Sequence, residues 1–502
     1  MNKKISIGAI ISYFTIGINI VSGIFYTPWM IHTIGDSEYA IYTLAMSIIT
    51  IFMMDFGLSS ATSRFVSRYY AVHDEDAANN FLGITLKLYI FIDIVMFFVL
   101  FVLFFCIEII YVQFSPSEIS ILKNVYVIVA FYSILSFPLL NFNGILMARE
   151  MFVSVKMCGL LSKVFTVGFV VIALLLGGDV YALVLINAGV QIVFSIVKLI
   201  LVKRAGVRFN LRYKDYALQK EIFAFSIWIT VVQLMQRFIF SLAPTFLAMF
   251  VAPIEIVYFS LATTIEGYVF TIGDAINGMF MPKIAQLDVT DNADDNILNL
   301  MVKVGRFQIF TIGMIIVVFC LVGSDFVTLW MGNGYEKVAM CGIFILIPSL
   351  LDIPQQIGKT TILVRDKVKQ QANIYICMVI IYIPLVLILT PRLGVIGTSI
   401  AVLIAYMVRS ILLSVLYHRE LGLDMVCFYK KVYAKWTIVL GTTLLIGCVI
   451  VNQIGSISFE GFILKCILCM VIYLIVSWLI FFSESEKQLV YSILKRLNKK
   501  KA

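Results

Sequence analysis

The chain has 502 residues, of which 61% are hydrophobic and 13% are charged, and its formal net charge is +9. These residues include too few polar side chains to cover the surface of a water-soluble protein of this size, so the composition excludes that class. The mean hydropathy of +1.01 indicates many membrane spans, each of which needs about 20 apolar residues to cross the hydrocarbon.

Apolar runs of this length recur from end to end of the chain and predict an all-α polytopic membrane protein. We predict fourteen spans, centred near residues 16, 48, 97, 134, 165, 191, 235, 268, 314, 350, 381, 405, 443 and 471. The predicted loops are too short to contain a soluble catalytic domain. The sequence also shows no nucleophile elbow, phosphate-cradling glycine loop or metal-ligand spacing, so we expect no enzyme activity, no cofactor and no metal site.

Basic residues alternate between the loops and predict the orientation of the chain. Alternate loops and both termini carry clusters of lysine and arginine, whereas the other loops offer only Lys123, Lys337 and Arg392. Because basic loops stay in the cytoplasm, we predict that both termini are cytoplasmic. The positive charge then reflects topology and contact with anionic lipids, and we expect no nucleic-acid partner.

An internal repeat relates the two halves of the chain. Shifts of 219 or 216 residues superimpose polar residues that lie within or beside apolar runs: Asp55 on Asp274, Arg64 on Lys283, Lys87 on Arg306, Glu150 on Asp366 and Gly206 on Gly422. Six spans separate the copies, and this even number predicts parallel repeats related by an axis along the membrane normal.

The repeat predicts the domain organisation. Residues 1–206 form a first lobe of six helices, 207–219 a cytoplasmic linker and 220–422 a second lobe of six helices. Residues 423–482 add two helices, and 483–502 form a basic amphipathic tail. The tail opens with an S-x-x-E pattern, which is typical of a helix start. We expect it to lie flat on the inner leaflet, with its lysines on lipid headgroups.

Two six-helix lobes with two added helices resemble a known transporter family. Together with the stretch Asp55-Phe56-Gly57-Leu58 and with Arg64, this arrangement resembles the polysaccharide (O-antigen, Wzx-type) flippases. They belong to the superfamily of the multidrug and toxic compound extrusion (MATE) transporters and the lipid II flippases. The resemblance covers the whole chain and implies that undecaprenyl-pyrophosphate-linked oligosaccharide is moved to the outer leaflet by alternating access. It also implies membrane lipids and other polysaccharide-assembly proteins as partners, and a lipid-tail groove at the thirteenth and fourteenth helices.

Other functions remain open. A small-molecule exporter or a lipid II flippase would use the same fold, although the multidrug exporters typically have twelve helices. A membrane-embedded glycan polymerase is disfavoured, because it would be expected to have a substantial outer loop and because it does not explain the repeat.

Polar residues on the seventh and eighth spans predict a cargo site. Gln233, Gln236 and Arg237 share one helix face. Arg237 lies near the middle of its span, where a charge costs about 2.5–3.5 kcal/mol and needs a partner or water. Glu266 lies at similar depth, on a stripe with Asn277. We predict that Arg237 contacts the phosphate of the cargo, with Glu266 as its counter-ion. A purely structural pair of Arg237 with Glu266 is an equal alternative.

Further polar residues predict the lining of a cavity. Four polar residues share one face of the tenth span, Asp352, Gln355, Gln356 and Lys359, and fully buried helix faces rarely carry so many polar groups. Lys163 on the fifth span and Arg409 on the twelfth lie deeper than snorkelling of their side chains explains. Each is therefore a candidate for lining the cavity of its lobe, with a structural role as the alternative.

Four charged residues recur by symmetry near the inner ends of helices and predict a gate. They are Asp55, Arg64, Asp274 and Lys283, and the repeated cations Lys87 and Arg306 fall near the same ends. We predict that the four form salt bridges when the transporter is closed to the cytoplasm. Simple capping of helix ends by charges is the alternative.

Overall fold

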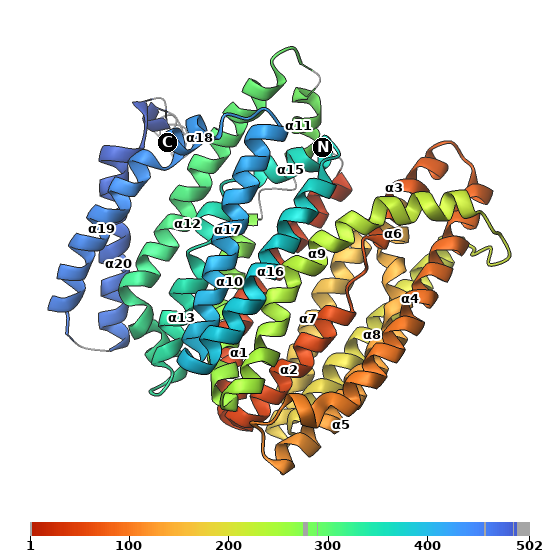
Figure 1. Cartoon of the computed structure of the whole chain (residues 1–502), viewed down its shortest axis with the longest axis horizontal. Coiled ribbons are helices and arrows are strands. Elements are labelled where there is room, and N and C mark those ends of the chain that lie inside the picture. The colour runs from red at the N-terminus through yellow and green to blue at the C-terminus, as the bar shows by residue number, and fades with distance from the viewer. Residues whose placement is uncertain (1–2, 275–279, 289, 456–457, 485, 489–502) are drawn as a thin grey trace, which may run out of the picture. The chain divides into compact units, whose positions relative to one another are not determined.

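The computed structural model describes the chain apart from residues 1–2, 275–279, 289, 456–457, 485 and 489–502, and it describes some further residues by their backbone alone. All regular elements in these described ranges are helices, as the sequence predicts (Figure 1). The chain forms two compact units, which are described separately below.

The first unit comprises Met1–Thr264 and Val368–Ala405. Its elements are α1 (Lys3–Ile34), α2 (Asp36–Phe52), α3 (Leu58–Ala71), α4 (Glu75–Ile110), α5 (Pro116–Ser136), the 3-10 helix η1 (Phe137–Leu140), α6 (Asn141–Ala148), α7 (Phe152–Leu175), α8 (Val180–Arg204), α9 (Tyr216–Phe250), most of α10 (Pro253–Asp274), α16 (Val368–Leu393) and the start of α17 (Val395–Glu420).

A core formed by α3, α4 and α6 organises one part of the first unit. The rings of Phe65 and Phe81 stack there with centroids 5.3 Å apart. Asn141 is fully buried and accepts a hydrogen bond of 2.9 Å from Thr62. Its amide donates to Thr85 at 3.5 Å. Hydrogen bonds between helices satisfy polar groups that the hydrocarbon cannot solvate.

The second unit comprises Ile265–Lys367 and Tyr406–Ala502. It contains the remainder of α10 and α17, α11 (Met281–Leu287), α12 (Ala293–Met331), α13 (Glu336–Leu346), α14 (Ser349–Asp352), α15 (Gln356–Val364), α18 (Met425–Val432), α19 (Ala434–Gln453), α20 (Phe459–Val476) and the π-helical turn η3 (Ser477–Phe481).

The long helix α12 holds the last two helices of the chain. Trp436 on α19 donates a 3.0 Å hydrogen bond to the hydroxyl of Tyr473 on α20, which in turn donates to the carbonyl of Phe310 on α12 at 3.0 Å. Gly313 allows this approach, because a Cβ there would lie 2.7 Å from the indole nitrogen of Trp436. The two helices are therefore packed parts of the second unit.

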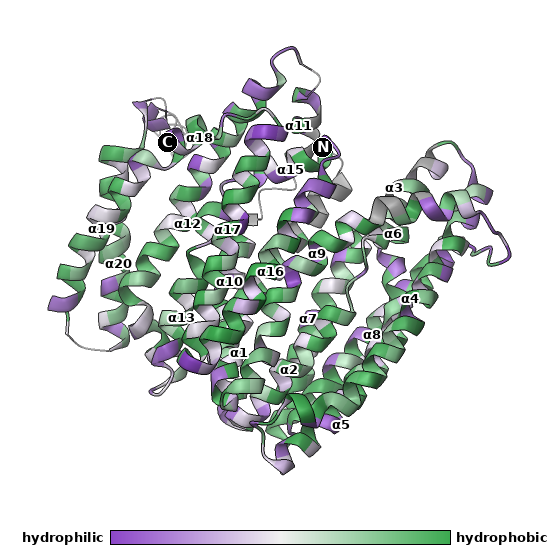
Figure 2. Cartoon of the chain, viewed as in Figure 1, coloured by the Kyte–Doolittle hydropathy of each residue, from purple (hydrophilic) through white to green (hydrophobic). Residues whose placement is uncertain are grey.

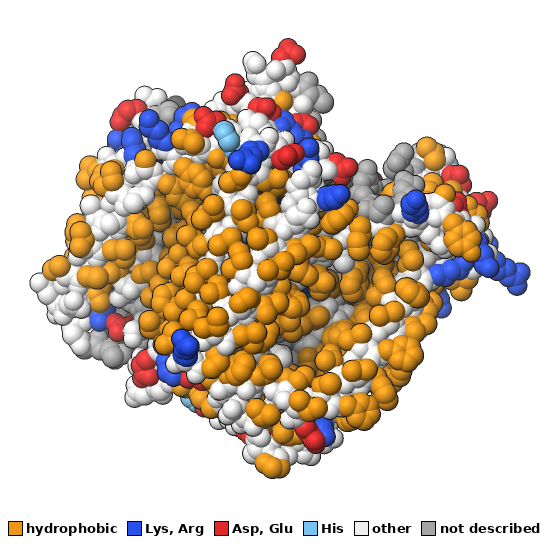
Figure 3. All heavy atoms as spheres, in the orientation of Figure 1, with side chains coloured by type: hydrophobic (Ala, Val, Ile, Leu, Met, Phe, Trp, Pro, Cys, Tyr) orange, Lys and Arg blue, Asp and Glu red, His pale blue; other side chains and the backbone are white. Residues whose placement is uncertain are grey.

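Long apolar helices in the described part of the chain correspond to thirteen of the fourteen predicted spans, if the bent pair counts as one. Twelve described helical segments are long and apolar enough to cross a membrane, and the bent pair Glu336–Asp352 and Gln356–Val364 gives a thirteenth. The remaining predicted span is α2, which has 17 residues and is shorter than the usual span. Apolar side chains cover the shafts of the helices, and charged residues gather near their ends (Figures 2 and 3).

Matched backbone conformations occur at positions related by the repeat. Glu150 follows α6 and Asp366 follows α15, and both have positive φ, 56° and 54°. Positive φ is uncommon outside glycine. The predicted lobes do not coincide with the two units, because α16 packs against α9 within the first unit. The division into lobes stays a prediction from the repeat.

The orientation predicts which turns react with impermeant thiol reagents. In a cysteine-free background, single cysteines at Asp179 and at Asn333 should be labelled from outside intact cells. Those at Arg212 and Asn292 should be labelled only after the cells are opened. All four positions are exposed, so accessibility within the protein does not decide the result. The opposite labelling of both pairs would show that the termini lie outside.

Candidate functional site

A buried carboxylate lies where the tenth predicted span breaks. Asp352 is the last residue of α14, and the axis bends by 54° before α15. Pro354 lies in the break, where its missing N–H and its ring favour an interruption of the helix. The Asp352 carboxylate contacts the guanidinium of Arg409 on α17 and the ammonium of Lys359 on α15, each at 2.6 Å. Three predicted site residues thus meet at one point.

This three-residue cluster is almost closed to solvent. The side chains of Arg409 and Asp352 are 1% and 7% exposed, and that of Lys359 is 19% exposed. Charges in such a place are stable only when they are paired and hydrogen-bonded. The geometry therefore supports the structural alternative for Arg409, and cavity lining by Arg409 and Lys359 stays a prediction.

Gln355 is held by two hydroxyl groups from other helices. Its amide nitrogen donates to Tyr429 on α18 at 2.8 Å, and its oxygen accepts from Ser414 on α17 at 3.1 Å. Tyr433 adds a 2.8 Å hydrogen bond to the carbonyl of Leu350. The sequence did not single out these three hydroxyl residues, because nothing local to them predicts contacts with a segment so distant in the chain.

Glu266 extends the cluster around Asp352. Ser349 donates to its carboxylate at 3.4 Å, and its charge interacts with those of Asp352 and Arg409. The two carboxylates and the two cations Arg409 and Lys359 give a formal charge of zero. All four residues belong to the second unit. We call this set the neutral cluster.

Arg237 lies on α9 in the first unit and, unlike Arg409, is not buried. Its side chain is exposed, and those of Gln233 and Gln236 on the same helix are half-buried. Asp55 is one charged neighbour of Arg237 in this unit; it lies between α2 and α3 and accepts a 3.0 Å hydrogen bond from the amide of Gly57. The pairing of Arg237 with Glu266 concerns two different units and stays a prediction.

The other predicted site residues lie apart from the neutral cluster. Lys163 is half-buried on α7 and makes no hydrogen bond or ion pair within the described part of the chain. Lys283 is exposed on α11. Asn277 and the side chains of Arg64 and Asp274 lie outside the described residues. The gate and the cargo-binding role of these residues therefore stay predictions.

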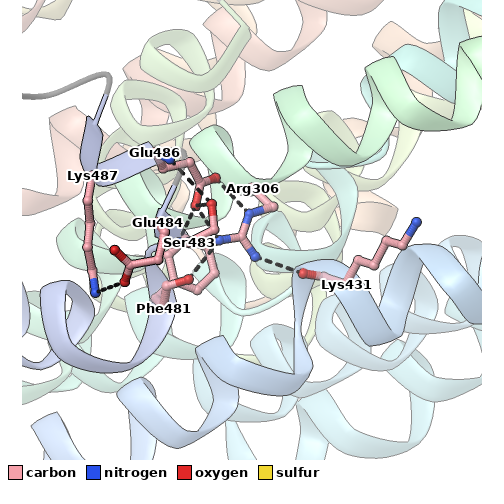
Figure 4. Close-up of polar contacts among 7 residues, drawn as sticks. All are labelled: Arg306, Lys431, Phe481, Ser483, Glu484, Glu486 and Lys487. Carbon is pink, nitrogen blue, oxygen red and sulfur yellow. Dashed lines mark hydrogen bonds and ion pairs between the residues drawn. The ribbon is translucent and has the colours of Figure 1, made fainter. Parts of the chain in front are cut away.

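Two cations related by the repeat hold the segments that follow their own halves of the chain. Lys87 on α4 donates a 2.7 Å hydrogen bond to the carbonyl of Tyr213, in the predicted linker. Arg306 on α12 donates to the carbonyl of Lys431 at 2.9 Å and to that of Phe481 at 2.7 Å (Figure 4). Both cations thus anchor connecting segments near the helix ends where we predicted a gate.

Arg306 also binds the beginning of the tail. Its Nε and Nη2 atoms donate to the two carboxylate oxygens of Glu486 at 2.9 and 2.8 Å, and its guanidinium lies 4.2 Å from the centroid of the Phe481 ring (Figure 4). Ser483 and Glu486 make the reciprocal hydrogen bonds expected from the S-x-x-E pattern. Burial alone would raise the pKa of Glu486, but the hydrogen bonds from Arg306 and Ser483 outweigh it and lower the pKa to about 2.

A protein family and several solved membrane-protein structures are similar to this chain. The family model described as "Polysaccharide biosynthesis protein" matches residues 6–280, more than half of the chain. No curated protein matches. The structure of the lipid II flippase MurJ, in an inward closed conformation, is similar with a TM-score of 0.71 and 11% identity, over 94% of this chain and 97% of MurJ.

Two further structures share the fold. The MATE multidrug transporter DinF-BH has a TM-score of 0.61 and 18% identity, over 83% of this chain and 94% of its own. A transporter of the MOP superfamily from Pyrococcus furiosus has a TM-score of 0.57 and 14% identity, over 84% of this chain and 95% of its own. At these identities the likeness shows the fold alone.

Breaking the neutral cluster should destabilise the protein strongly. The change Arg409→Ala leaves Asp352 with one cation in place of two, and removing one partner of a buried charge pair costs about 3–5 kcal/mol. Thermal unfolding of the purified protein in detergent measures the effect. As a control, Lys367→Ala removes an exposed pair with Glu420 and should cost about 0–1 kcal/mol. Equal losses from the two changes would contradict the structural role of Arg409.

The pKa of Glu486 predicts how docking of the tail depends on pH. Because the pKa is below its usual 4.5 in the docked state, the ion pair with Arg306 stabilises docking fully above pH 4.5. That stabilisation should disappear as the pH falls from 4.5 towards 2. The mobility of a spin label at Gln488 reports docking, and Glu486→Gln should release the tail already at pH 7. The control Glu484→Gln, which removes only an exposed contact with Lys487, should not release it.

Proposed function

The chain belongs to the polysaccharide biosynthesis protein family, and on that premise we propose that it is a flippase for a lipid-linked oligosaccharide. The cargo is a repeat unit of O-antigen, capsule or exopolysaccharide on undecaprenyl pyrophosphate, carried from the inner to the outer leaflet by alternating access. The protein acts in the bacterial inner membrane with cytoplasmic termini, beside other polysaccharide-assembly proteins.

The exposed guanidinium of Arg237 is the observation that carries this proposal. Arg237 lies ten residues into the apolar segment Ile227–Phe250. Placing its charge in contact with lipid hydrocarbon at that depth would cost free energy. An exposed charge at this depth needs water or a ligand. Arginine binds phosphate oxygens through two parallel hydrogen bonds, which suits a pyrophosphate. Gln233 and Gln236, on the same helix, supply amide groups that suit the sugar.

Asp55 gives Arg237 a counter-ion when no cargo is bound. The two charges interact within the first unit, and Asp55 is itself held by the Gly57 amide. A pyrophosphate carries more negative charge than one carboxylate and competes for the same guanidinium. Asp55, Arg64, Asp274 and Lys283 then serve as the gate, with Asp55 linking the gate to the cargo site.

The alternative is a small-molecule exporter, which the shared fold with DinF-BH supports. Exporters of organic cations need acidic or aromatic groups in the cavity. The half-buried and unpaired ammonium of Lys163 on the described part of α7 fits an anionic cargo better. Uptake of organic cations by vesicles containing the purified protein would favour the alternative.

Arg237→Ala should abolish glycan export while the protein still inserts and folds. Loss of a charge-assisted hydrogen bond pair should weaken cargo binding at least about tenfold. Arg237→Lys should recover only part of the activity, because lysine cannot make two parallel hydrogen bonds. Export is measured by surface glycan and abundance by immunoblot. Arg392→Ala, which removes an exposed cation at the end of α16, is the control and should export normally.

Double variants separate the cargo role from a structural pairing. If Arg237 only neutralises a carboxylate, Arg237→Ala should lower abundance. Joining it with Asp55→Asn or with Glu266→Gln should then restore both abundance and export. A double variant that exports normally would contradict the phosphate role. Normal abundance without export in both double variants would agree with it.

A further inference from the structure

An apolar groove lies between α7 and α8 in the first unit. Its volume is about 430 Å³, which is within the range of small-molecule sites. The ring of Phe165 lies 5.6 Å from that of Phe169 and 6.0 Å from that of Phe194 between ring centroids. Val190, Val193 and Gly189 line the groove from α8, and all of its lining residues are apolar.

Gly189 keeps the groove open. A Cβ added at this position would meet no other atom within 4 Å, so a larger side chain would extend into free space. Because Gly189 itself lines the groove, a leucine there would fill part of the volume. The groove thus depends on one residue that can be changed without a steric clash at its Cβ.

A cation lies at one end of the groove. Lys198 follows Phe194 by four residues, one helical turn, and therefore shares its face of α8. Lys198 lies near Cys158, which packs against Val190 and Phe194 of the groove lining. Among the described residues Lys198 makes no ion pair and no hydrogen bond.

The depth of these residues matches that of a membrane lipid. Lys198 lies six residues before the end of α8 at Arg204, which is about 9 Å along the helix. Phe194 and Ile186, which line the groove, lie about 6 Å and 18 Å further into the membrane. In a phospholipid the phosphate lies near the membrane surface and the acyl chain lies deeper. Lys198 and the apolar groove lie in the same order along α8.

We propose that the groove binds one acyl chain of an anionic phospholipid, whose phosphate is held by Lys198. The lipid comes from the leaflet at the Arg204 end of α8. The site does not depend on the proposed function, because its residues are separate from Arg237, Asp55 and the neutral cluster. A competing explanation is that Lys198 only extends its ammonium towards water, and the groove then has no preference for charged lipids.

Native mass spectrometry of the purified full chain tests the proposal. With added phosphatidylglycerol and phosphatidylcholine of equal chain length, the protein should retain one phosphatidylglycerol preferentially. Lys198→Gln should weaken this retention about tenfold, the loss expected for one charge-assisted hydrogen bond. Gly189→Leu should remove it. The controls are Lys203→Gln and Gly441→Leu, an exposed cation and an exposed glycine with free space outside the groove, and both should bind as the unchanged protein does.

A second measurement needs no variant. Phosphatidylglycerol with a photoreactive group in its acyl chain should cross-link to peptides containing Phe165–Phe169 or Ile186–Phe194. Equal retention of both lipids, or cross-links elsewhere only, would overturn the proposal. Displacement of the phospholipid by a short prenyl diphosphate at equal concentration would also overturn it, since the groove would then belong to the cargo. Loss of glycan export in Arg237→Ala with unchanged lipid retention would separate this site from the proposed cargo site.

Discussion

The pairing of Asp352 with Arg409 and Lys359 is the interaction on which the second unit depends. A lone carboxylate with 7% exposure would be too costly inside a membrane protein, so its position requires both cations. This requirement fixes α15 and α17 around the break after α14. The surrounding hydroxyl groups, including that of Tyr429, then satisfy Gln355 and attach α18 to the same point. A single buried charge thus determines how four helices pack.

Hydropathy and the repeat predicted the spans, but they did not predict the partners of the polar residues. The break at Pro354 and the polar face beside it were visible in the sequence, whereas the contact of Asp352 with Arg409 joins residues 57 positions apart. Arg237 was predicted to meet Glu266, and the neighbour found for it within its own unit is Asp55. Asp55 lies beside a sharp turn at Phe56 and Gly57, both with positive φ. Helical periodicity cannot predict the direction in which such a turn sends a side chain.

Two cations that the repeat matches, Lys87 and Arg306, make the same kind of contact in their two halves of the chain. Lys87 and Arg306 occupy matched positions, and each donates to a carbonyl in the segment that follows its half of the chain. Backbone carbonyls that leave a helix near a membrane surface need donors, and a long basic side chain supplies them. The chain that follows the second half consists of two helices and a tail, and Arg306 meets the tail through Glu486. Arginine suits this position because its planar group can serve two carbonyls and a carboxylate together.

Charges that hold a fold and charges that hold a cargo have opposite requirements. The charges of Asp352, Arg409 and Lys359 are already paired, so a pyrophosphate could use Arg409 only after Asp352 had lost a partner, at a cost similar to breaking a buried ion pair. An exposed guanidinium such as that of Arg237 has no such cost. A phosphate can replace the water molecules or the nearby carboxylate that would otherwise contact it. Under the proposed function, transport also requires release of the cargo, and Asp55 would then again neutralise Arg237. The proposed cargo role of Arg237 therefore rests on an exposed charge with a nearby carboxylate, a combination that the buried cations Arg409 and Lys359 lack.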